Sequence, residues 1–414
     1  MRRFPAILWA LALAALCAPA AAADLAVVGA RLYPTPTAAA IARATVVVHD
    51  GKISAVGAAG TVKVPRGARV IDGRGLVATA GFWNSHVHLM TPVLLDAVTK
   101  PDAEVAAELK AVFTRWGFTT VYETAGRLDT TLDVRRRIAS GAIAGPDILT
   151  VGDAFYPKGG TPIYVRRLLE AHHFPSGEVE SIPSAVARLD DQARRGSNGV
   201  KIFAGAIVGG KIGVLPMRRD VARALVAEAH RLGQPVFAHP SNTEGVEISM
   251  DSGVDVLAHT APMSGPWSPA LVQRIKAHKM ALIPTLTLFE VEARKSGESP
   301  EDSAKDMQAA LQQLKAYSDA GGQILFGTDV GYTDAYDTTE EYRLMGQVMG
   351  YRQILAALTV NPAMRFGFAA RRGKLARGFD GDLTVLAADP AADVTAFAKV
   401  RYTIRQGAVI YVAP

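Results

Sequence analysis

The chain has 414 residues, of which 49% are apolar and 20% are charged. This balance is ordinary for a folded globular protein and excludes a disordered chain. The net charge of +6 is spread thinly, with no basic block and no stretch that interleaves basic and aromatic residues, so we expect no nucleic-acid partner. The length suffices for one barrel and a smaller module.

The first residues are typical of an export signal. Two arginines follow Met1, an apolar run covers 6–15, and small residues at 21–23 suit cleavage after Ala23. The apolar run is too short for a good membrane span, so we expect no stable membrane anchor. The one cysteine, Cys17, lies in this segment, which leaves the mature chain without disulfides. We therefore expect residues 1–23 to be a signal peptide and the mature protein to be periplasmic or secreted.

Both ends of the mature chain consist of short strand-like runs separated by turns. Asp50-Gly51 divides two such runs near the N-terminus, and Gln406-Gly407 divides two near the C-terminus. Neither end has enough strands for a good sheet by itself. We therefore expect residues 24–80 and 366–414 to form one composite β-sandwich domain.

Between these ends, in residues 81–365, strand-like and helical segments alternate, which predicts βα units. The candidate strands end near His88, Glu123, Val151, Phe203, His239, His259, Leu286 and Asp329. The main helix candidates are 103–116, 184–195, 219–232, 269–278 and 304–320. Eight units predict an α/β fold of the (β/α)8 TIM-barrel type. In such barrels the active site lies at one face, so we expect residues 81–365 to be the catalytic domain. A doubly wound open sheet competes, but the Gly-rich phosphate loop that it normally carries is missing after the first strand.

Several strand ends carry potential metal ligands. His86 and His88 point to the same side of their strand, and two imidazoles so placed can bind one divalent ion. His239 and His259 each close a short apolar run, where a structural core histidine is the usual interpretation. For Asp329 the usual interpretation is a turn or a helix cap. Their joint occurrence at the strand ends of one barrel favours a metal site instead.

Lys201 is the most unusual of these residues. It lies between Val200 and Ile202, in a strand that looks buried, where an unpaired ammonium is costly. The side chain must therefore pair with a carboxylate, reach solvent or be chemically modified. A structural ion pair is the ordinary explanation for such a lysine taken alone.

The complete pattern resembles the amidohydrolase superfamily in its two-metal form, and within it the imidazolonepropionase-like and prolidase-like branch. The residues that match the family motifs are His86 and His88 after Gly81-Phe82, Lys201 on the fourth strand, His239 and His259 on the fifth and sixth, and Asp329 on the eighth. The resemblance implies a lysine at position 201 that is carboxylated and bridges two divalent metal ions.

The same resemblance implies a role for each residue. His86, His88 and Asp329 would hold one metal, and His239 and His259 the other. Zinc fits such nitrogen and oxygen ligands best, and Mn, Co or Fe also fit. Asp329 would be the catalytic residue, taking a proton from the attacking hydroxide and delivering it to the leaving group.

The implied function is that of a metal-dependent hydrolase that cleaves an amide (C–N) bond of a small substrate such as a dipeptide or N-acyl amino acid. A cyclic amide or lactone hydrolase is the alternative on the same site, and a catalytically inactive periplasmic binding protein is the alternative of another class. The loops depart from the family pattern where substrate would lie, so the substrate contacts stay unassigned. Residues near the expected catalytic face are Tyr122, Glu123, Tyr156, Arg166, Arg167 and Trp267. Whether the chain forms a homo-oligomer is also left open.

Overall fold

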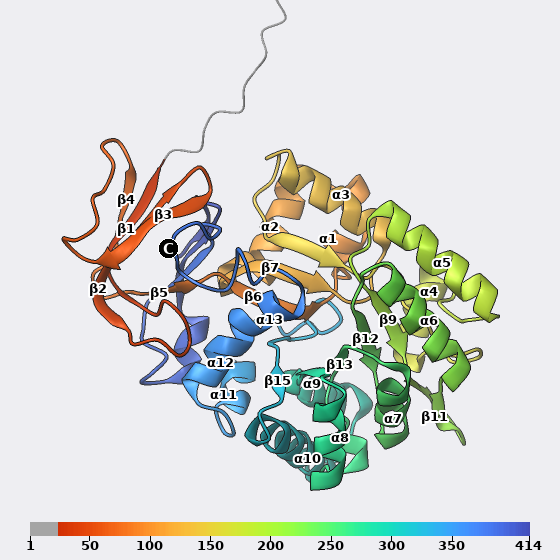
Figure 1. The fold of residues 1–414 in the computed structure, drawn as a ribbon. Helices are drawn as coiled ribbons and strands as arrows, with labels where there is room; N and C mark the ends of the chain where they lie inside the picture. The colour runs from red at the N-terminus through yellow and green to blue at the C-terminus, as the bar shows by residue number, and fades with distance from the viewer. Residues whose placement is uncertain (1–23) are drawn as a thin grey trace, which may run out of the picture.

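The computed structural model describes residues 24–414. The expected signal peptide at residues 1–23, including Cys17, therefore lies outside the described residues. Figure 1 shows a β-rich part, drawn in red and dark blue, beside a larger α/β part. Among the described helices, none combines the length and the apolar character needed to cross a membrane.

Strands from both chain ends form one eight-stranded sheet. Its members are β1 (Leu25–Leu32), β2 (Ile41–His49), β3 (Lys52–Ala58), β4 (Arg69–Asp72), β5 (Val77–Ala80), β16 (Leu383–Leu386), β17 (Val400–Arg405) and β18 (Ala408–Val412). The order is β18-β17-β16-β5-β1-β2-β3, and β4 pairs with β1. The expected turns at Asp50-Gly51 and Gln406-Gly407 are present, and all four residues have positive φ, as two-residue hairpin turns of type I′ require. The strands pair as a single sheet, so the predicted two-sheet sandwich is not confirmed.

Eight parallel strands carry the α/β part, and they fall into two sheets. One contains β6 (Phe82–Val87), β7 (Phe118–Glu123) and β8 (Asp147–Thr150); the other contains β9 (Val200–Phe203), β12 (Val236–His239), β13 (Val256–Ala258), β14 (Ala281–Ile283) and β15 (Gln323–Ile324). Isolated parallel bridges, Phe155 to Ile202 and Val87 to Val330, link segments of the two sheets. A single closed barrel, as predicted, is therefore found only in part. The chain leaves regular strand conformation at both junctions, and β15 is only two residues long.

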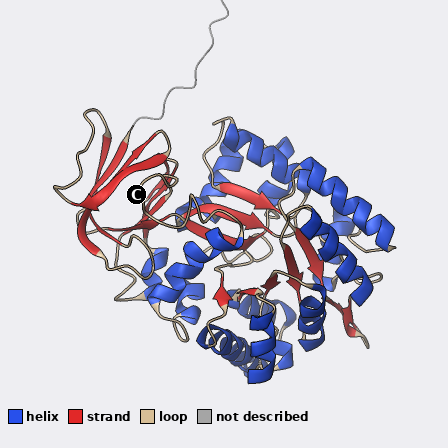
Figure 2. Cartoon of the chain, in the orientation of Figure 1, coloured by secondary structure: helices blue, strands red, loops and turns tan. Residues whose placement is uncertain are grey.

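Helices lie on the outside of these strands (Figure 2). They are α1 (Pro92–Leu95), α2 (Asp102–Val112), α3 (Leu128–Ala139), α4 (Ile163–Ala171), α5 (Ile182–Arg195), α6 (Arg219–Arg231), α7 (Thr243–Ser252), α8 (Pro269–Ala277), α9 (Leu286–Ser296), α10 (Pro300–Asp319), α11 (Thr339–Met345), α12 (Tyr351–Leu358) and α13 (Val360–Arg365). Short 3-10 turns are η1 (Ala97–Thr99), η2 (Thr114–Trp116), η3 (Pro262–Ser264) and η4 (Val394–Ala398), and β10 (Gly205–Gly209) pairs with β11 (Gly213–Pro216) in a hairpin. Local sequence determines where helices begin and end. At α5, Ser181 and Ser184 form a capping box, and Gly196 ends the helix in the left-handed conformation.

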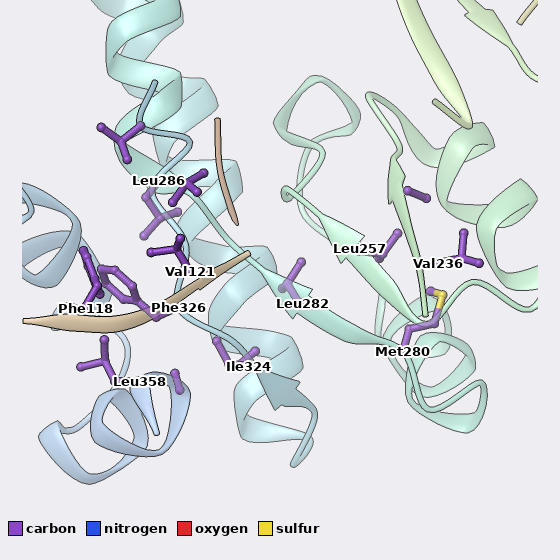
Figure 3. Packing of buried hydrophobic residues seen from close by; sticks show 14 of the residues in the cluster. Phe118, Val121, Val236, Leu257, Met280, Leu282, Leu286, Ile324, Phe326 and Leu358 are labelled. Atoms are coloured by element: carbon purple, nitrogen blue, oxygen red, sulfur yellow. The ribbon is translucent and has the colours of Figure 1, made fainter. Parts of the chain in front are cut away.

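Apolar side chains fill the space between helices and strands and the space between the two parallel sheets. Figure 3 shows the first kind, in which Phe118 and Phe326 pack with ring centroids 5.8 Å apart. A separate cluster draws buried residues from both sheets, including Trp83 of β6 and Phe237 of β12. Each large apolar side chain buried in this way stabilises the fold by about 1.5–3 kcal/mol. This core holds the strand ends in place below the site.

A buried arginine joins the composite sheet to the parallel strands. Arg372 lies 2.7 Å from Asp147, the first residue of β8, and 2.9 Å from Asp380, which precedes β16. Asp382 is 3.7 Å away. The guanidinium therefore neutralises the buried carboxylate of Asp382 and shares that of Asp380 with Lys52.

Candidate metal centre

All six residues singled out by the sequence line one cavity of about 470 Å³. His86 lies on β6 and His88 directly follows that strand. Lys201 lies on β9, and His239 is the last residue of β12. His259 directly follows β13, and Asp329 lies in the segment after β15. Strand alternation explains the placement of Lys201. Lys201 and Phe203 face the cavity, while Val200 and Ile202 pack in the main core.

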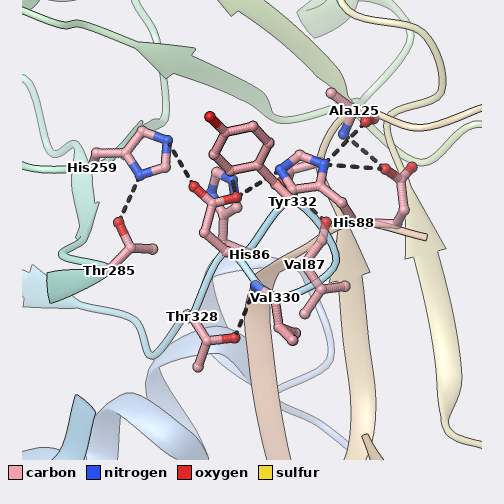
Figure 4. A network of polar contacts seen from close by, with 12 residues as sticks. His86, Val87, His88, Ala125, His259, Thr285, Thr328, Val330 and Tyr332 are labelled. Carbon is pink, nitrogen blue, oxygen red and sulfur yellow. Dashed lines mark hydrogen bonds and ion pairs between the residues drawn. The ribbon is translucent and has the colours of Figure 1, made fainter. Parts of the chain in front are cut away.

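Nitrogen and oxygen atoms of four of these residues converge (Figure 4). His86, His259 and Asp329 each offer one ligand atom, and these atoms lie within 4.8 Å of one another. The Asp329 Oδ1 atom lies 2.8 Å from His88 Nε2 and 3.4 Å from His86 Nε2. The Asp329 Oδ2 atom lies 3.6 Å from His259 Nε2. Four side chains distant in sequence thus share one small volume.

The lone pairs of this cluster suit a metal ion. Within residues 24–414, both ring nitrogens of His86 are buried and have no hydrogen-bond partner. Burial lowers the pKa of His86 to about 3, and burial also lowers the pKa of His239 and His259. These imidazoles are therefore neutral, as metal ligation requires. Buried polar atoms without partners are rare, and a divalent cation is a natural partner for this donor set.

Two of the histidines are oriented by groups behind them. His259 Nδ1 lies 2.6 Å from Thr285 Oγ1, and that hydroxyl donates to the carbonyl of Pro284, so it accepts from the His259 ring. His88 Nδ1 lies 3.0 Å from the carbonyl oxygen of Ala125, which can only accept. In both rings Nδ1 therefore carries the proton, and Nε2 faces the cluster. Partners of this kind fix the tautomer of metal-binding histidines.

The charge environment of His88 differs from that of the other rings. Burial opposes its protonation, but Asp329 and Glu123 outweigh burial and raise the pKa of His88 to about 9. Glu123 itself is fully buried and accepts from Thr150 Oγ1 at 2.6 Å and from the backbone N–H of Ala125 at 2.9 Å. Before His88 could bind a metal it would have to release this proton.

Lys201 is buried among apolar and aromatic atoms. Only 1% of its surface is exposed, and its Nζ atom lies 5.5 Å from the centre of the Phe203 ring. Burial lowers the pKa of Lys201 to about 7, although the more distant Asp329 and Glu123 oppose this change. Among the ion pairs of the described residues none includes Lys201. The ordinary explanation, a structural ion pair, is therefore not supported.

The backbone around the cluster is held in unusual conformations. His259, Thr285 and Asp329 have φ of 106°, 45° and 60°. Positive φ costs a non-glycine residue about 1–3 kcal/mol, and such residues gather at functional sites. At Gly331, just after Asp329, an added Cβ would lie 1.7 Å from the carbonyl oxygen of His88. The loop thus packs directly on the strand that carries His86 and His88.

The residues expected near the catalytic face divide into two groups. Tyr156 lines the cavity, and Glu123 contacts His88. Tyr122 instead donates to the carbonyl of Asn198 and packs between the sheets, and Trp267 packs against Tyr317.

Neither arginine of the expected set provides a cation to the cavity. Arg166 donates to the carbonyl of Thr161, and Arg167 is exposed and does not line the cavity.

Sequence reasoning missed three residues beside the cluster. Tyr164 and Tyr332 line the cavity, and Thr285 supports His259. The one available signal was Pro162, which caps the start of α4 two residues before Tyr164. Nothing local singles out Thr285 or Tyr332.

Several known proteins are similar to this chain. An uncharacterized protein of Mycobacterium tuberculosis is 29% identical over 226 residues, which cover 51% of this chain and 57% of that protein. A dihydroorotase of Anaeromyxobacter dehalogenans is 25% identical, and the alignment covers 85% of each chain. The crystal structure of a putative prolidase from Bifidobacterium longum superposes with a TM-score of 0.78 at 25% identity, covering 94% of this chain and 95% of that one.

A family model also matches most of the chain, from the start of β5 into β18. The model described as the amidohydrolase family matches residues 77–410. The chain therefore belongs to the amidohydrolase family.

Proposed function

We propose that the protein is a metal-dependent hydrolase that cleaves an amide (C–N) bond of a small substrate. The observation that carries the proposal is the convergence of buried ligand atoms of His86, His259 and Asp329 in one cavity, where both ring nitrogens of His86 have no hydrogen-bond partner among the described residues. Neutral imidazoles and a carboxylate are ligands that divalent transition metals bind well. Dipeptides and N-acyl amino acids are the substrates that the family resemblance implies.

The proposed site holds two divalent ions, of which zinc fits best and Mn, Co or Fe also fit. His86, His88 and Asp329 hold one ion, and His239 and His259 hold the other. Carboxylated Lys201 bridges them. The burial of Lys201 without a partner carboxylate supports this role, since carboxylation turns a costly buried cation into an anionic ligand. When bound, such ions lower the pKa of water and polarise the scissile carbonyl.

The side chains of the chain itself handle the proton and the orientation of the site. Asp329 takes a proton from the attacking water and delivers it to the departing nitrogen, because its carboxylate lies at the centre of the cluster. Thr285 and Ala125 keep the Nε2 atoms of His259 and His88 directed toward Asp329.

A second candidate is the hydrolysis of a cyclic amide or lactone on the same site, which the dihydroorotase relative favours. A catalytically inactive periplasmic binding protein is the candidate of another class. It would have no need for six potential ligands around one cavity, whereas all six are present here.

Metal analysis tests the proposal. After loading with zinc, we expect about two metal ions per chain, in line with two-metal hydrolases, and a clear loss of metal in Lys201→Ala. Lys211→Ala, in the exposed turn of the β10–β11 hairpin, is the matched control and should keep both ions. With 13C-labelled bicarbonate, a carbamate signal should appear in the wild type and disappear in Lys201→Ala. A chain that takes up no zinc and hydrolyses no amide would overturn the proposal.

We also propose the division of the mature chain into a β domain of 24–80 and 366–414 and a catalytic domain of 81–365. Pairing of β5 with β16 supports the first of these. Export after removal of residues 1–23 remains a proposal from the sequence. The mass of the protein recovered from a periplasmic fraction tests it, because a retained N-terminus would contradict cleavage after Ala23.

A further inference from the structure

The wall of the cavity beyond the metal cluster is largely apolar. It is formed by α4 and the segment after it, by α9 and by η3. The side chains that matter for the argument are Leu168, Leu169, Phe174, Leu288, Phe289 and Met263. A cavity of about 470 Å³ is in the size range of sites that enclose a drug-sized molecule. Such a wall gains most from an alkyl or aryl group on the substrate.

Outside the metal cluster, little positive charge is available in the cavity for a substrate carboxylate. Among residues 24–414, Arg127 and Lys201 are the only arginine and lysine side chains in the wall. The Arg127 guanidinium lies 3.1 Å from Asp153 Oδ1 and stacks at 4.6 Å over the ring of Phe174. This arginine is therefore already paired, and a substrate carboxylate would have to break that pair or be buried without a partner.

The other charges of the wall are negative. Besides Asp153, the carboxylates of Glu292, Glu298 and Asp306 line the cavity. Glu292 accepts a hydrogen bond from Tyr332 at 3.0 Å and lies 3.6 Å from Lys295. The field of these groups opposes the approach of an anion. Away from the metal cluster, the cavity wall thus disfavours the binding of an acidic substrate, although the whole chain carries a net charge of +6.

A neutral hydrogen-bond donor is available instead. The buried hydroxyl of Tyr164 has no hydrogen-bond partner within residues 24–414. Its ring lies 6.4 Å from that of His239 and 5.4 Å from that of Tyr332, measured between centroids. The hydroxyl can therefore donate to an uncharged polar group of a substrate held beside the metal cluster.

We propose that the substrate is an uncharged amide that carries an alkyl or aryl group and no carboxylate, with the apolar group held between α4 and α9. This inference rests on the proposed hydrolase function and narrows it. Free dipeptides and N-acyl amino acids are then poor substrates, because each brings a carboxylate into a cavity whose one arginine outside the metal cluster is already paired.

Matched compounds test the inference. N-hexanoyl-2-phenylethylamine and N-hexanoyl-L-phenylalanine differ only by the carboxylate, and N-hexanoyl-L-phenylalaninamide restores the bulk without the charge. We expect kcat/KM for hexanoate release to be at least about tenfold higher for both neutral compounds than for the acid. Equal or faster hydrolysis of the acid would overturn the inference.

A variant shows whether the pairing of Arg127 with Asp153 causes the preference for neutral compounds over the acid. Asp153→Asn removes the partner of Arg127 and should narrow the preference for neutral compounds by about tenfold, because the guanidinium becomes free to pair with the acid. Asp191→Asn removes an exposed partner of Arg194 on α5, outside the cavity, and should leave the preference unchanged. An unchanged preference in both variants would contradict the role given to the Arg127–Asp153 pair.

Binding separates this inference from the proposed function. Calorimetric titration of the zinc-loaded protein should give at least about tenfold tighter binding of N-hexanoyl-2-phenylethylamine than of the acid. Equal or tighter binding of the acid would refute the substrate class even if amides are hydrolysed. If no compound is hydrolysed while two zinc ions are bound, the hydrolase function fails, and the binding preference still decides the inference.

Discussion

The hydrogen bond behind His259 gives the sharpest quantitative prediction. Thr285 Oγ1 lies 2.6 Å from His259 Nδ1, and both side chains are buried. Thr285→Val keeps the shape of the side chain but removes the acceptor. The Nδ1–H group would then be buried without a partner, and the ring would lose the contact that directs Nε2 toward Asp329.

The size of the effect follows from this geometry. A buried polar group left without its partner costs about 1–3 kcal/mol. This corresponds to a loss of metal affinity of roughly 10- to 100-fold, as is typical when the partner behind a histidine ligand is removed. The folded state should survive, because the cavity wall and the core do not change.

The assay is competition for zinc with a chelator of known affinity. Thr285→Ser should restore most of the affinity, since it returns the hydroxyl. Thr287→Val is the matched control, because the Thr287 hydroxyl donates to Glu341 at 2.8 Å and touches no proposed ligand. That control should lower the free energy of unfolding but leave the zinc affinity unchanged. Equal zinc affinities for wild type and Thr285→Val would refute the reasoning.

Two further predictions concern stability. Arg372→Met should lower the free energy of unfolding by about 3–5 kcal/mol, because it leaves the buried carboxylate of Asp382 without its basic partner, whereas Arg371→Met, whose guanidinium is half-exposed, should cost less than about 1 kcal/mol. Urea denaturation measures both, and similar values would contradict the buried-charge argument. Gly331→Ala should lower the melting temperature far more than Gly67→Ala: both have positive φ, which costs about 1–2 kcal/mol, but only at Gly331 would the new Cβ meet backbone. Equal melting temperatures would show that the loop after Asp329 can move away from His88.

The positions of the proposed ligands could be predicted because their signals are local. Two histidines two residues apart point to one side of a strand, and a lysine in an apolar strand is costly wherever that strand lies. The signals that mark helix ends are also local, as at Gly196, which ends α5. The first six predicted strand ends, from His88 to His259, thus lie within one residue of the ends in the structure.

The remaining features depend on contacts between distant segments. Val87 and Val330 meet through one isolated bridge, and β15 stops at Ile324, well before Asp329. No periodic pattern marks such a junction, so the closed barrel was predicted where two linked sheets are found. The pairing of Arg127 with Asp153 decides what the cavity accepts, and only the folded chain brings the two together.

The junction between β5 and β16 has a consequence for how the protein is made. Thr79 of β5 donates to the carbonyl of Thr384 in β16, across a sequence separation of 305 residues. While the ribosome synthesises the intervening chain, one edge of β5 has no strand to pair with, and open strand edges invite pairing with other chains. Closing so long a loop is also slow, because contacts far apart in sequence form late. Completion of this sheet is therefore a late folding event, and the nascent chain is most exposed to aggregation just before β16 emerges.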